Sequence, residues 1–330
     1  MNVFLVTSPF QYICANEARL AYHLEKNILI YVEQESETGI RQMERLFEEA
    51  AWQHIIRIPR SNRTFHVPSA IKKVKRLLGN TSIENFVFSE YYGWRSNLFL
   101  ANLNADHYIY IDDGTSTLLE YDDFILPNKA YTRKRTFQDS IIRLQGLKPP
   151  QHQTRNDKLE LFSIFEFNED EIAFRKNNLD GLKKLIHTEN VYHESAPVGL
   201  IGQACVGEKR GISIETYIGE LSTIADSEPK GIMYFPHRTE SETVKSKVLE
   251  IKNLTYHHPS SPIELEIALS GQQLSGITGV TSNALYTVSL IYKDLPIQVI
   301  GGELKGNNDR DARVRSFLNN YFKDYRARNI

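Results

Sequence analysis

Two adjacent aspartates stand between a short apolar run and a glycine. Asp112 and Asp113 follow HYIYI at 107–111, and Gly114 comes next. Neighbouring carboxylates at a strand end are costly to bury unless they are solvated or used, and one of them could accept a proton from a sugar hydroxyl. They could also hold a divalent cation, but no other residue near them has the spacing of a ligand set. The alternative is that both acids stabilise the start of a helix.

A histidine and an arginine follow a second apolar run. His237 and Arg238 come after GIMYF at 231–235, separated from it by a proline. A histidine there could protonate a leaving oxygen, and an arginine could bind a phosphate through two hydrogen bonds. The alternative is a histidine with a purely structural role. The adjacency of the two residues favours a phosphate contact.

A glycine-flanked loop follows the apolar run VGLIG at 198–202. It begins with Gly202 and Gln203 and ends with Gly207 and Glu208. Glycines let a backbone approach a ligand closely, and Glu208 would then face that ligand. An ordinary surface loop is the alternative.

Three further helix starts carry polar groups. Glu264 opens a helix and could hold a ribose diol, or could simply complement the helix dipole. Ser8 and Gln11 follow the first apolar run, where a helix N-terminus suits anions or sugar hydroxyls, although Ser8 could merely cap the helix. A third start combines hydroxyls and backbone N–H groups in a phosphate cradle that has no Walker lysine; its residues are Thr281, Ser282 and Asn283.

The elements that would position these residues alternate between strand and helix. The expected strands of the first half lie at 2–7, 28–32, 54–58, 85–88 and 107–111, and those of the second half at 198–202, 231–235, 253–257, 275–279 and 296–300. Short apolar strands separated by helices predict two parallel sheets covered on both faces. Ligands of such sheets bind beyond the carboxyl ends of the strands.

The pattern is interrupted between 121 and 195. We expect a connector and part of an acceptor-facing surface there, with a strand at 159–167 and a helix at 169–186. The predicted domains are therefore 1–190, on the acceptor side, and 191–330, which ends in a long helix at 309–327.

Composition excludes several classes of protein. The chain has 330 residues and a net charge of -2, with 39 basic and 41 acidic residues, which argues against a nucleic-acid partner. Two cysteines are too few for a disulfide framework. No apolar run reaches the ~18 residues of a membrane span, and MNVFLVTSPF lacks the features of a signal peptide. These observations predict a cytoplasmic protein.

Taken in order, the motifs resemble glycosyltransferase family 52, the bacterial lipooligosaccharide sialyltransferases. The matching segments are Ser8-Pro9-Phe10-Gln11, Asp112-Asp113-Gly114, Leu200-Ile201-Gly202-Gln203, Pro236-His237, Ser261-Pro262-Ile263-Glu264 and Thr281-Ser282-Asn283-Ala284-Leu285. The resemblance implies two Rossmann-like domains facing across a cleft, the glycosyltransferase B fold. It also implies a CMP-activated sialic acid donor, a lipooligosaccharide or capsule glycan as acceptor, and no metal cofactor.

The resemblance also implies roles for individual residues. His237 would contact the donor phosphate and act as the acid for departing CMP, Glu264 would hold the ribose, and Thr281 and Ser282 would hold the phosphate. The base would be Glu208, or, by likeness to a related sialyltransferase family, Asp112 or Asp113.

The chain departs from the family pattern where Arg238 follows the histidine instead of proline, and where a glutamate replaces an aspartate after the Gly-Gln loop. Other nonulosonic acids, such as pseudaminic or legionaminic acid, and Kdo-type sugars therefore remain open as donors.

Two alternatives belong to other classes: a non-catalytic nucleotide-sugar or polysaccharide-binding module, and a structural partner in capsule assembly. Contact with the inner face of a membrane is a further hypothesis. The basic helix at 68–78 and the amphipathic helix at 311–330 could lie on anionic lipid. Alternatively, the apolar face of the last helix packs on the N-terminal domain; its residues are Val314, Phe317, Leu318, Tyr321 and Phe322.

Overall fold

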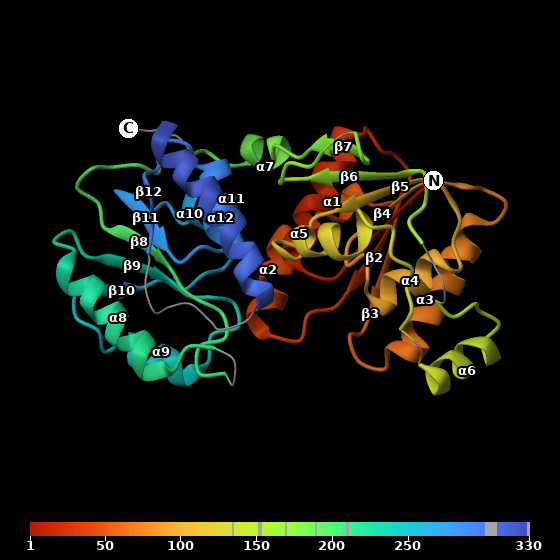
Figure 1. Cartoon of the computed structure of the whole chain (residues 1–330), viewed down its shortest axis with the longest axis horizontal. Helices are drawn as coiled ribbons and strands as arrows, with labels where there is room; N and C mark the ends of the chain where they lie inside the picture. Colours follow the sequence, from red (N-terminus) through yellow and green to blue (C-terminus); the bar gives the residue numbers. More distant parts are fainter. Residues whose placement is uncertain are drawn as a thin grey trace. The chain divides into compact units, whose positions relative to one another are not determined.

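The computed structural model describes residues 1–133, 135–150, 154–168, 170–188, 190–208, 211–300 and 309–328. The chain divides into two compact units, Met1–Gly181 and Leu182–Ile330 (Figure 1). The sequence analysis placed this boundary between residues 190 and 191. Each unit is a parallel sheet with its own helices, and the two are described separately.

The N-terminal unit is built on seven parallel strands in the order β3-β2-β1-β4-β5-β6-β7. The strands are β1 (Asn2–Val6), β2 (Asn27–Val32), β3 (His54–Ile58), β4 (Ile83–Phe88), β5 (Ala105–Ile111), β6 (Leu159–Ser163) and β7 (Ala173–Lys176). The helices are α1 (Pro9–Ala21), α2 (Glu37–Leu46), η1 (Glu49–Ala51), α3 (Arg63–Leu78), α4 (Trp94–Leu100), α5 (Ser116–Glu120), the π-helical turn η2 (Tyr121–Ile125) and α6 (Thr136–Leu144). The short helix α7 (Asp180–Leu185) spans the boundary between the two units.

The central strands are apolar on both faces because helices cover both faces. In β1, Val3 and Leu5 belong to one buried cluster with residues of α3 and α4. Phe4 and Val6 belong to a second cluster with residues of α1 and α2. This arrangement explains why β1 is a continuous apolar run and not an alternating one.

The region after β5 does not follow the sequence prediction. The strand expected at 159–167 is shorter, and the helix expected at 169–186 forms only in its last part, as α7 (Asp180–Leu185). Residues 173–176 instead form β7, whose residue Ala173 is paired with Glu160 and Lys176 with Ser163. The segment AFRK has a helix-like charge density but lies at the sheet edge, where exposed polar side chains are tolerated.

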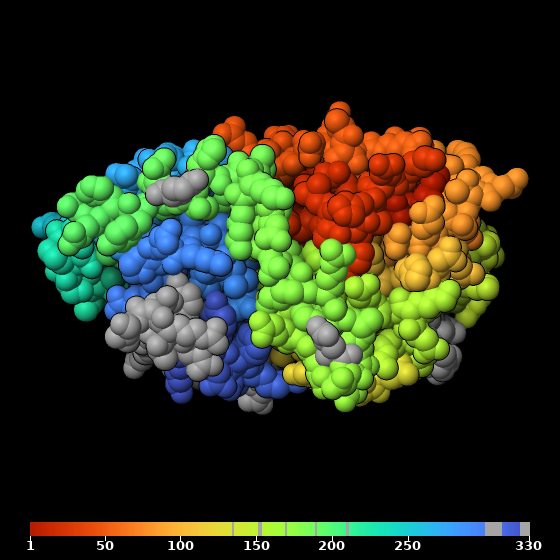
Figure 2. All heavy atoms as spheres, turned by 90° about the horizontal axis from the view of Figure 1, so that it is seen from above, coloured from red at the N-terminus to blue at the C-terminus, as the bar shows by residue number. Residues whose placement is uncertain are grey.

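This edge of the sheet lies beside α1, although the two are far apart in sequence (Figure 2, red against yellow-green). The Gly181 N–H donates to Glu17 Oε2 at 3.0 Å. The Tyr22 hydroxyl donates to Glu160 at 2.7 Å, and the Arg175 guanidinium lies 4.5 Å from the Tyr22 ring centre. Much of the segment that we interpreted as a connector is therefore an integral part of the N-terminal unit.

The C-terminal unit is a five-stranded parallel sheet in the order β10-β9-β8-β11-β12. The strands are β8 (Val198–Ile201), β9 (Ile232–Phe235), β10 (Leu254–Tyr256), β11 (Gly276–Gly279) and β12 (Ile297–Val299). The helices are α8 (Ile214–Ser227), α9 (Glu242–Val248), α10 (Ile263–Leu269), α11 (Asn283–Ile291) and α12 (Asp309–Arg328). Side by side, α8 and α9 bury their apolar residues against one face of the sheet (Figure 1).

The apolar face of the last helix packs within the C-terminal unit. Leu318 and Phe322 are buried. The rings of Tyr321 and Tyr286 of α11 meet edge to face, 4.5 Å apart. Part of this face, which the sequence analysis assigned either to lipid or to the N-terminal domain, therefore packs on α11. Because these side chains are already packed, the helix gives no support to the lipid-contact hypothesis. Among the described residues, no helix combines the length and apolarity needed to cross a bilayer.

Candidate active site

The order of the strands in each sheet indicates where a ligand would bind. In the N-terminal sheet the chain runs outward from β1 to β3 and then restarts on the other side at β4. In the C-terminal sheet the same reversal occurs between β8 and β11. Ligands of open α/β sheets bind at such switch points, beyond the carboxyl ends of the strands. The loops after β1, β4 and β5, and after β8, β9 and β11, are therefore the candidate site segments.

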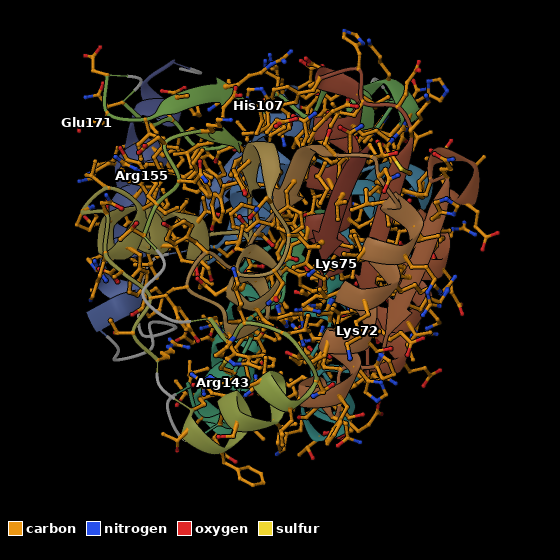
Figure 3. The ribbon with its side chains drawn as sticks, turned by 90° about the vertical axis from the view of Figure 1, so that its right-hand side faces the viewer. Lys72, Lys75, His107, Arg143, Arg155 and Glu171 are labelled. Carbon is orange, nitrogen blue, oxygen red and sulfur yellow. The ribbon has the colours of Figure 1, made fainter. Side chains whose placement is uncertain are left out.

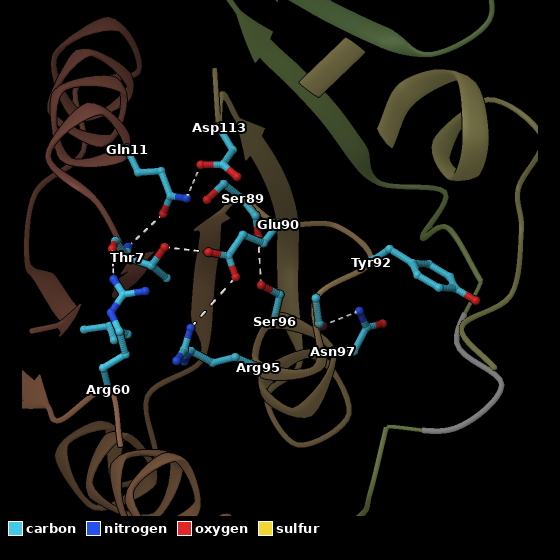
Figure 4. A network of polar contacts seen from close by, with 12 residues as sticks. Thr7, Gln11, Arg60, Ser89, Glu90, Tyr92, Arg95, Ser96, Asn97 and Asp113 are labelled. Atoms are coloured by element: carbon cyan, nitrogen blue, oxygen red, sulfur yellow. Dashed lines mark hydrogen bonds and ion pairs between the residues drawn. The ribbon is translucent and has the colours of Figure 1, made fainter. Parts of the chain in front are cut away.

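The loop after β1 is tied to the loop after β5 (Figure 4). The Thr7 N–H donates to Gln11 Oε1 at 2.7 Å, and Gln11 Nε2 donates to Asp113 Oδ1 at 2.7 Å. Gln11 is fully buried, so it fixes the position of the Asp113 carboxylate. The Ser8 hydroxyl accepts the Gln11 N–H at 3.2 Å and caps α1, as the structural alternative for Ser8 requires.

The two adjacent aspartates occupy different environments. Asp112 is completely buried and accepts hydrogen bonds from the Ser163 hydroxyl at 2.5 Å and the Ile164 N–H at 2.7 Å. Burial raises the pKa of Asp112 to about 7, although these hydrogen bonds act in the opposite direction. Asp113 is half-buried. Asp112 thus joins β5 to β6, whereas Asp113 lies at the switch-point edge.

Glu90 is a site residue that the sequence analysis missed. It follows β4, and its φ of 53° places it in the left-handed region, which is uncommon for a glutamate. Its carboxylate accepts the Thr7 hydroxyl at 2.5 Å and lies 3.9 Å from Arg95 (Figure 4). Backbone strain at a strand end is typical of functional positions. Because ligands of parallel sheets bind beyond the carboxyl ends of the strands, the position of Glu90 shortly after the predicted strand at 85–88 could have identified it.

In the C-terminal unit, Gly202 brings two loops into close contact. Its N–H donates to the Phe235 carbonyl at 2.8 Å. A Cβ on Gly202 would come within 2.6 Å of the Tyr234 hydroxyl oxygen and 3.0 Å of the His237 nitrogen. The loop after β8 can therefore reach the loop after β9 only because residue 202 has no side chain.

His237 is neutral and has a defined tautomer. Its Nδ1 accepts the Thr239 N–H at 3.3 Å and lies 2.9 Å from the Thr239 hydroxyl. Since Nδ1 is an acceptor, the proton of the neutral ring is on Nε2, from which it can donate a hydrogen bond to a ligand. Burial, assisted by the neighbouring charge of Arg238, lowers the pKa of His237 to about 4.

A phenol–carboxylate network supports these loops, and the sequence analysis did not foresee it. The Tyr234 hydroxyl donates to Glu240, and the Tyr256 hydroxyl donates to the same carboxylate at 2.7 Å. The Tyr217 hydroxyl lies 2.9 Å from that of Tyr234 and accepts the Gln203 N–H at 3.2 Å. Burial raises the pKa of Glu240 despite these hydrogen bonds. The network connects the start of the Gly-Gln loop to the loop that carries His237.

Glu208 lies beside a pocket formed by these two loops. The pocket measures about 220 Å³, and its lining includes Gln203, Gly207 and Glu208 from one loop and Thr239 and Glu240 from the other. Glu208 itself is exposed. Its carboxylate is thus available to a ligand in the C-terminal unit, whereas the Asp113 carboxylate belongs to the N-terminal unit.

The start of α10 holds two buried carboxylates with different partners. Glu264 accepts the Thr287 hydroxyl of α11 at 3.0 Å, and burial raises its pKa. Glu266 accepts the Ser261 N–H at 2.6 Å and lies 2.7 Å from His257 Nε2. Although burial opposes it, hydrogen bonding from His257 and the backbone lowers the pKa of Glu266. Glu266 shapes the loop before α10, and Glu264 is held against α11.

The start of α11 also carries polar groups. Ser282 caps the helix by accepting the Leu285 N–H at 3.2 Å. Thr281 and Asn283 are half-buried beside it. The Asn283 Oδ1 atom is buried and has no hydrogen-bond partner among the described residues. A buried amide oxygen without a partner is unfavourable, so this position is suited to a donor supplied by a ligand.

Replacing Gly202 with alanine should destabilise the C-terminal unit and weaken ligand binding there, because the new methyl group would displace Tyr234 or the His237 backbone. Overpacking of this kind costs about 1–3 kcal/mol of unfolding free energy. Gly219 is the matched control, since it lies inside α8 with nothing within 4 Å of an added Cβ. Thermal unfolding should show a lower Tm for Gly202→Ala and an unchanged or higher Tm for Gly219→Ala. Equal Tm values would contradict the close approach at Gly202.

No family model and no curated protein sequence matches the chain. Solved structures are similar to it in fold. A putative UDP-N-acetylglucosamine 2-epimerase from Listeria monocytogenes aligns with a TM-score of 0.57 at 10% identity, covering 98% of this chain and 88% of the other. The UDP-GlcNAc 2-epimerase from Neisseria meningitidis, bound to UDP-GlcNAc, gives 0.53 at 11% identity, with coverage of 96% and 85%. That from Methanocaldococcus jannaschii gives 0.52 at 13%, with 95% and 86%.

These similarities identify the class of fold. The chain consists of two Rossmann-like α/β domains of the glycosyltransferase B type, and this part of the sequence prediction is confirmed. At 10–13% identity, the similarity concerns the fold alone. The likeness to family 52 sialyltransferases rests on the sequence motifs.

Proposed function

We propose that the protein is an inverting glycosyltransferase that moves a nonulosonic acid, such as sialic acid, from a CMP-activated donor to a hydroxyl of a bacterial surface glycan. The observation that carries the proposal is the carboxyl edge of the C-terminal sheet. There the adjacent strands β9, β8 and β11 end in His237, Gly202 and the Thr281–Ser282 pair. His237 can supply a proton to a nucleotide phosphate, and Gly202 lets the backbone approach it closely. The helix start at Thr281 and Ser282 suits the negative charge of that phosphate.

The proposed reaction breaks the bond between the anomeric carbon of the sugar and the phosphate oxygen of CMP. The acceptor oxygen forms a bond to that carbon from the opposite face, and a carboxylate takes the hydroxyl proton. This single displacement converts a β-linked donor into an α-linked product. Arg238 and His237 Nε2 stabilise the departing phosphate. To act as the acid, His237 must first be protonated, which the negative charge of a bound phosphate favours; the imidazolium then transfers one proton to CMP and returns to the neutral ring. Glu264 and Asn283 are assigned to the nucleotide.

Three carboxylates are candidates for the base that takes the proton of the acceptor hydroxyl. Asp113 is half-buried and oriented by Gln11. Glu208 is exposed beside the pocket of the C-terminal unit. Asp112 is the least suited of the three because both of its oxygens accept hydrogen bonds inside the N-terminal unit.

Nucleotide binding tests the donor assignment directly. A ligand present at 100 times its Kd adds about 2.7 kcal/mol to the unfolding free energy, which thermal unfolding detects. CMP should raise the Tm of the wild-type protein, and UMP should do so only at higher concentration. The same CMP shift should be reduced in Gly202→Ala and retained in Gly219→Ala. A protein that responds to uridine nucleotides and not to CMP would overturn the donor assignment.

A second candidate is a nucleotide-sugar epimerase that acts on UDP-GlcNAc. The proteins named as UDP-GlcNAc 2-epimerases share the fold. Glu90 and Asp113 also follow the adjacent strands β4 and β5, so two carboxylates that could remove and return a proton lie at one edge. Stabilisation by UDP, together with formation of an epimer from UDP-GlcNAc, would favour this candidate. Binding of CMP-sugars without any CMP release would favour the non-catalytic module.

We expect activity to persist in EDTA. Among the described residues, no group of three or more His, Cys, Asp or Glu side chains could hold a metal ion. In the proposed chemistry, His237 and Arg238 stabilise the phosphate in place of a metal ion. CMP release should be measured with and without EDTA, then after addition of Mg²⁺ or Mn²⁺. Loss of turnover in EDTA and its recovery with metal would contradict a metal-free mechanism.

Peripheral membrane contact remains a proposal, now centred on α3 and α6. Large apolar side chains are exposed there: Phe65 is 58%, Phe137 78% and Leu144 87% accessible. Gln145 Nε2, just after α6, donates to the Thr64 carbonyl of α3 at 3.1 Å. The same two helices carry basic residues, and Figure 3 shows three of them on the face turned to the viewer: Lys72, Lys75 and Arg143.

Anionic vesicles test this proposal. The wild-type protein should co-sediment with phosphatidylglycerol vesicles at low salt, since each basic residue near such a surface contributes about 1 kcal/mol. Substituting the exposed cations of α3 with glutamine should abolish co-sedimentation; these residues are Lys72, Lys73, Lys75 and Arg76. Arg41→Gln, which removes one charge from an exposed position of α2 outside this surface, should leave co-sedimentation unchanged. Absence of wild-type binding at low salt would refute membrane contact.

A further inference from the structure

An incompletely paired arginine lies at the switch point of the N-terminal sheet. The Arg95 side chain is only 11% exposed, and its Nε atom is buried with no hydrogen-bond partner among the described residues. Arg95 forms an ion pair with Glu90, whose Oε2 is 3.9 Å from Arg95 Nη1, too far for a good hydrogen bond. A buried guanidinium held so loosely is costly unless an anion completes its coordination.

Two further arginines lie near Arg95. Arg60 donates from Nη2 to the Thr7 carbonyl at 2.6 Å, and the Thr7 hydroxyl bonds to Glu90 (Figure 4). Arg63 stacks on Trp94, the residue before Arg95, with its Cζ 5.5 Å from the ring centre. Burial lowers the pKa of Arg95, and the charges of Arg60 and Arg63 lower it further although Glu90 opposes them. The Arg95 guanidinium is therefore close enough to those of Arg60 and Arg63 to be repelled by both.

The surrounding acids do not balance this charge. Glu90 is already shared between the Thr7 hydroxyl and Arg95. Arg135 adds a fourth positive charge, which lowers the pKa of Arg63 after the larger effect of burial. Next to Glu90, the Ser89 hydroxyl is buried and its oxygen has no partner among the described residues. The region thus combines excess cations with unused hydrogen-bonding atoms.

We propose that Arg60, Arg63 and Arg95 form a subsite for a phosphoryl group on the acceptor. The proposal rests on the proposed function, which gives the N-terminal unit the acceptor. Guanidinium groups match the oxygens of a phosphoryl group through paired hydrogen bonds, and three of them suit a multiply charged tetrahedral anion better than a neutral sugar. The acceptor class is therefore a phosphorylated glycan or a glycan on a phosphoryl-linked lipid. The Thr7–Glu90 pair positions Arg95 for this contact.

Inorganic pyrophosphate is the probe for the subsite. Isothermal titration at low ionic strength should show binding to the wild-type protein that weakens as salt is added. Arg95→Gln and Arg63→Gln should each weaken binding by about tenfold to a hundredfold, the range expected for loss of a charge-assisted hydrogen bond. Arg41→Gln removes the same charge from an exposed position of α2 and should bind as the wild type does. Far-UV circular dichroism and Tm check that each variant is folded.

Several outcomes would overturn the subsite. These are absence of wild-type binding, equal weakening in Arg41→Gln, and unchanged binding in both Arg95→Gln and Arg63→Gln. Saturating CMP identifies the source of the phosphoryl group. Unchanged pyrophosphate affinity supports an acceptor subsite, and competition would assign these arginines to the donor and contradict the proposal.

The test also separates the subsite from the proposed function. CMP should raise the Tm of Arg95→Gln as it does that of the wild type. If CMP has no effect on either protein while pyrophosphate binding depends on Arg95, the CMP donor assignment fails and the anion subsite stands. With an active enzyme, Arg95→Gln should raise the KM for a phosphorylated acceptor and leave the KM for its dephosphorylated form unchanged.

Discussion

Replacement of His237 with glutamine should lower the rate of CMP release by at least about 10²-fold, the contribution typical of a positioned general acid. Glutamine keeps a polar side chain but cannot deliver a proton to the departing phosphate. The substitution should leave the fold intact, because His237 is half-buried on the loop after β9 and the network below it is made by Tyr234 and Glu240. Initial rates with saturating donor and acceptor measure the effect.

Proton uptake gives an independent readout for His237. Its pKa of about 4 makes the free side chain neutral at pH 6. A bound phosphate dianion would favour the charged imidazole and raise this pKa, so CMP binding should take up protons. Calorimetry in buffers of different ionisation enthalpy should show this uptake in the wild type and not in His237→Gln. His258→Gln, an exposed neighbour, is the control. Wild-type turnover in a folded His237→Gln protein would rule out the acid role.

Removal of the true base should lower turnover by roughly 10²–10⁴-fold with little change in donor affinity. The two variants to compare are Asp113→Asn and Glu208→Gln. Asp113→Asn should have the large effect if the base belongs to the acceptor-side unit, and Glu208→Gln if it belongs to the loop after β8. CMP release and CMP affinity are measured for each. Small effects in both variants would show that the base lies elsewhere, with Glu90 as the next residue to test.

Unlike the two base variants, Asp112→Asn should change the unfolding free energy more than the rate of CMP release. The pKa of Asp112 is about 7 in the folded protein and about 3.9 in an unfolded chain. The unfolded chain therefore loses this proton first as pH rises. The contribution of this group to the unfolding free energy should fall between pH 4 and pH 7 by up to about 1.4 kcal/mol per unit. Asp112→Asn should remove that slope. A slope equal to that of the wild type would contradict the assigned burial.

The periodicity of the sequence was sufficient to predict two parallel α/β sheets, because strands such as β1 are apolar throughout and separated by amphipathic helices. The expectation that ligands bind beyond the carboxyl ends of the strands then identified four residues at the carboxyl edges of the two sheets: Gln11, Asp113, Gly202 and His237. It could not separate Asp112 from Asp113. Neighbouring side chains on a strand point to opposite faces, and which face is buried depends on the partner strand β6.

The residues that were missed depend on contacts between distant segments. The position of Glu90 after a strand could be read from the sequence, but its contact with the Thr7 hydroxyl depends on β4 lying beside β1. The Tyr217–Tyr234–Glu240 network likewise joins α8, β9 and the loop after β9. The segment 173–176 shows the opposite error, since its composition favoured a helix and pairing with β6 made it a strand. Local patterns do not contain these pairings.

The most direct test of the account is acceptor-dependent CMP release. The purified protein is incubated with CMP-activated sialic, pseudaminic or legionaminic acid, or with a CMP-Kdo-type sugar, together with lipooligosaccharide or capsule oligosaccharides, and both CMP and the glycan product are quantified. We predict that at least one donor gives CMP release that the acceptor stimulates, with one α-linked nonulosonic acid added per CMP. No CMP release from any of these donors, alongside conversion of UDP-GlcNAc to an epimer, would contradict the central claim.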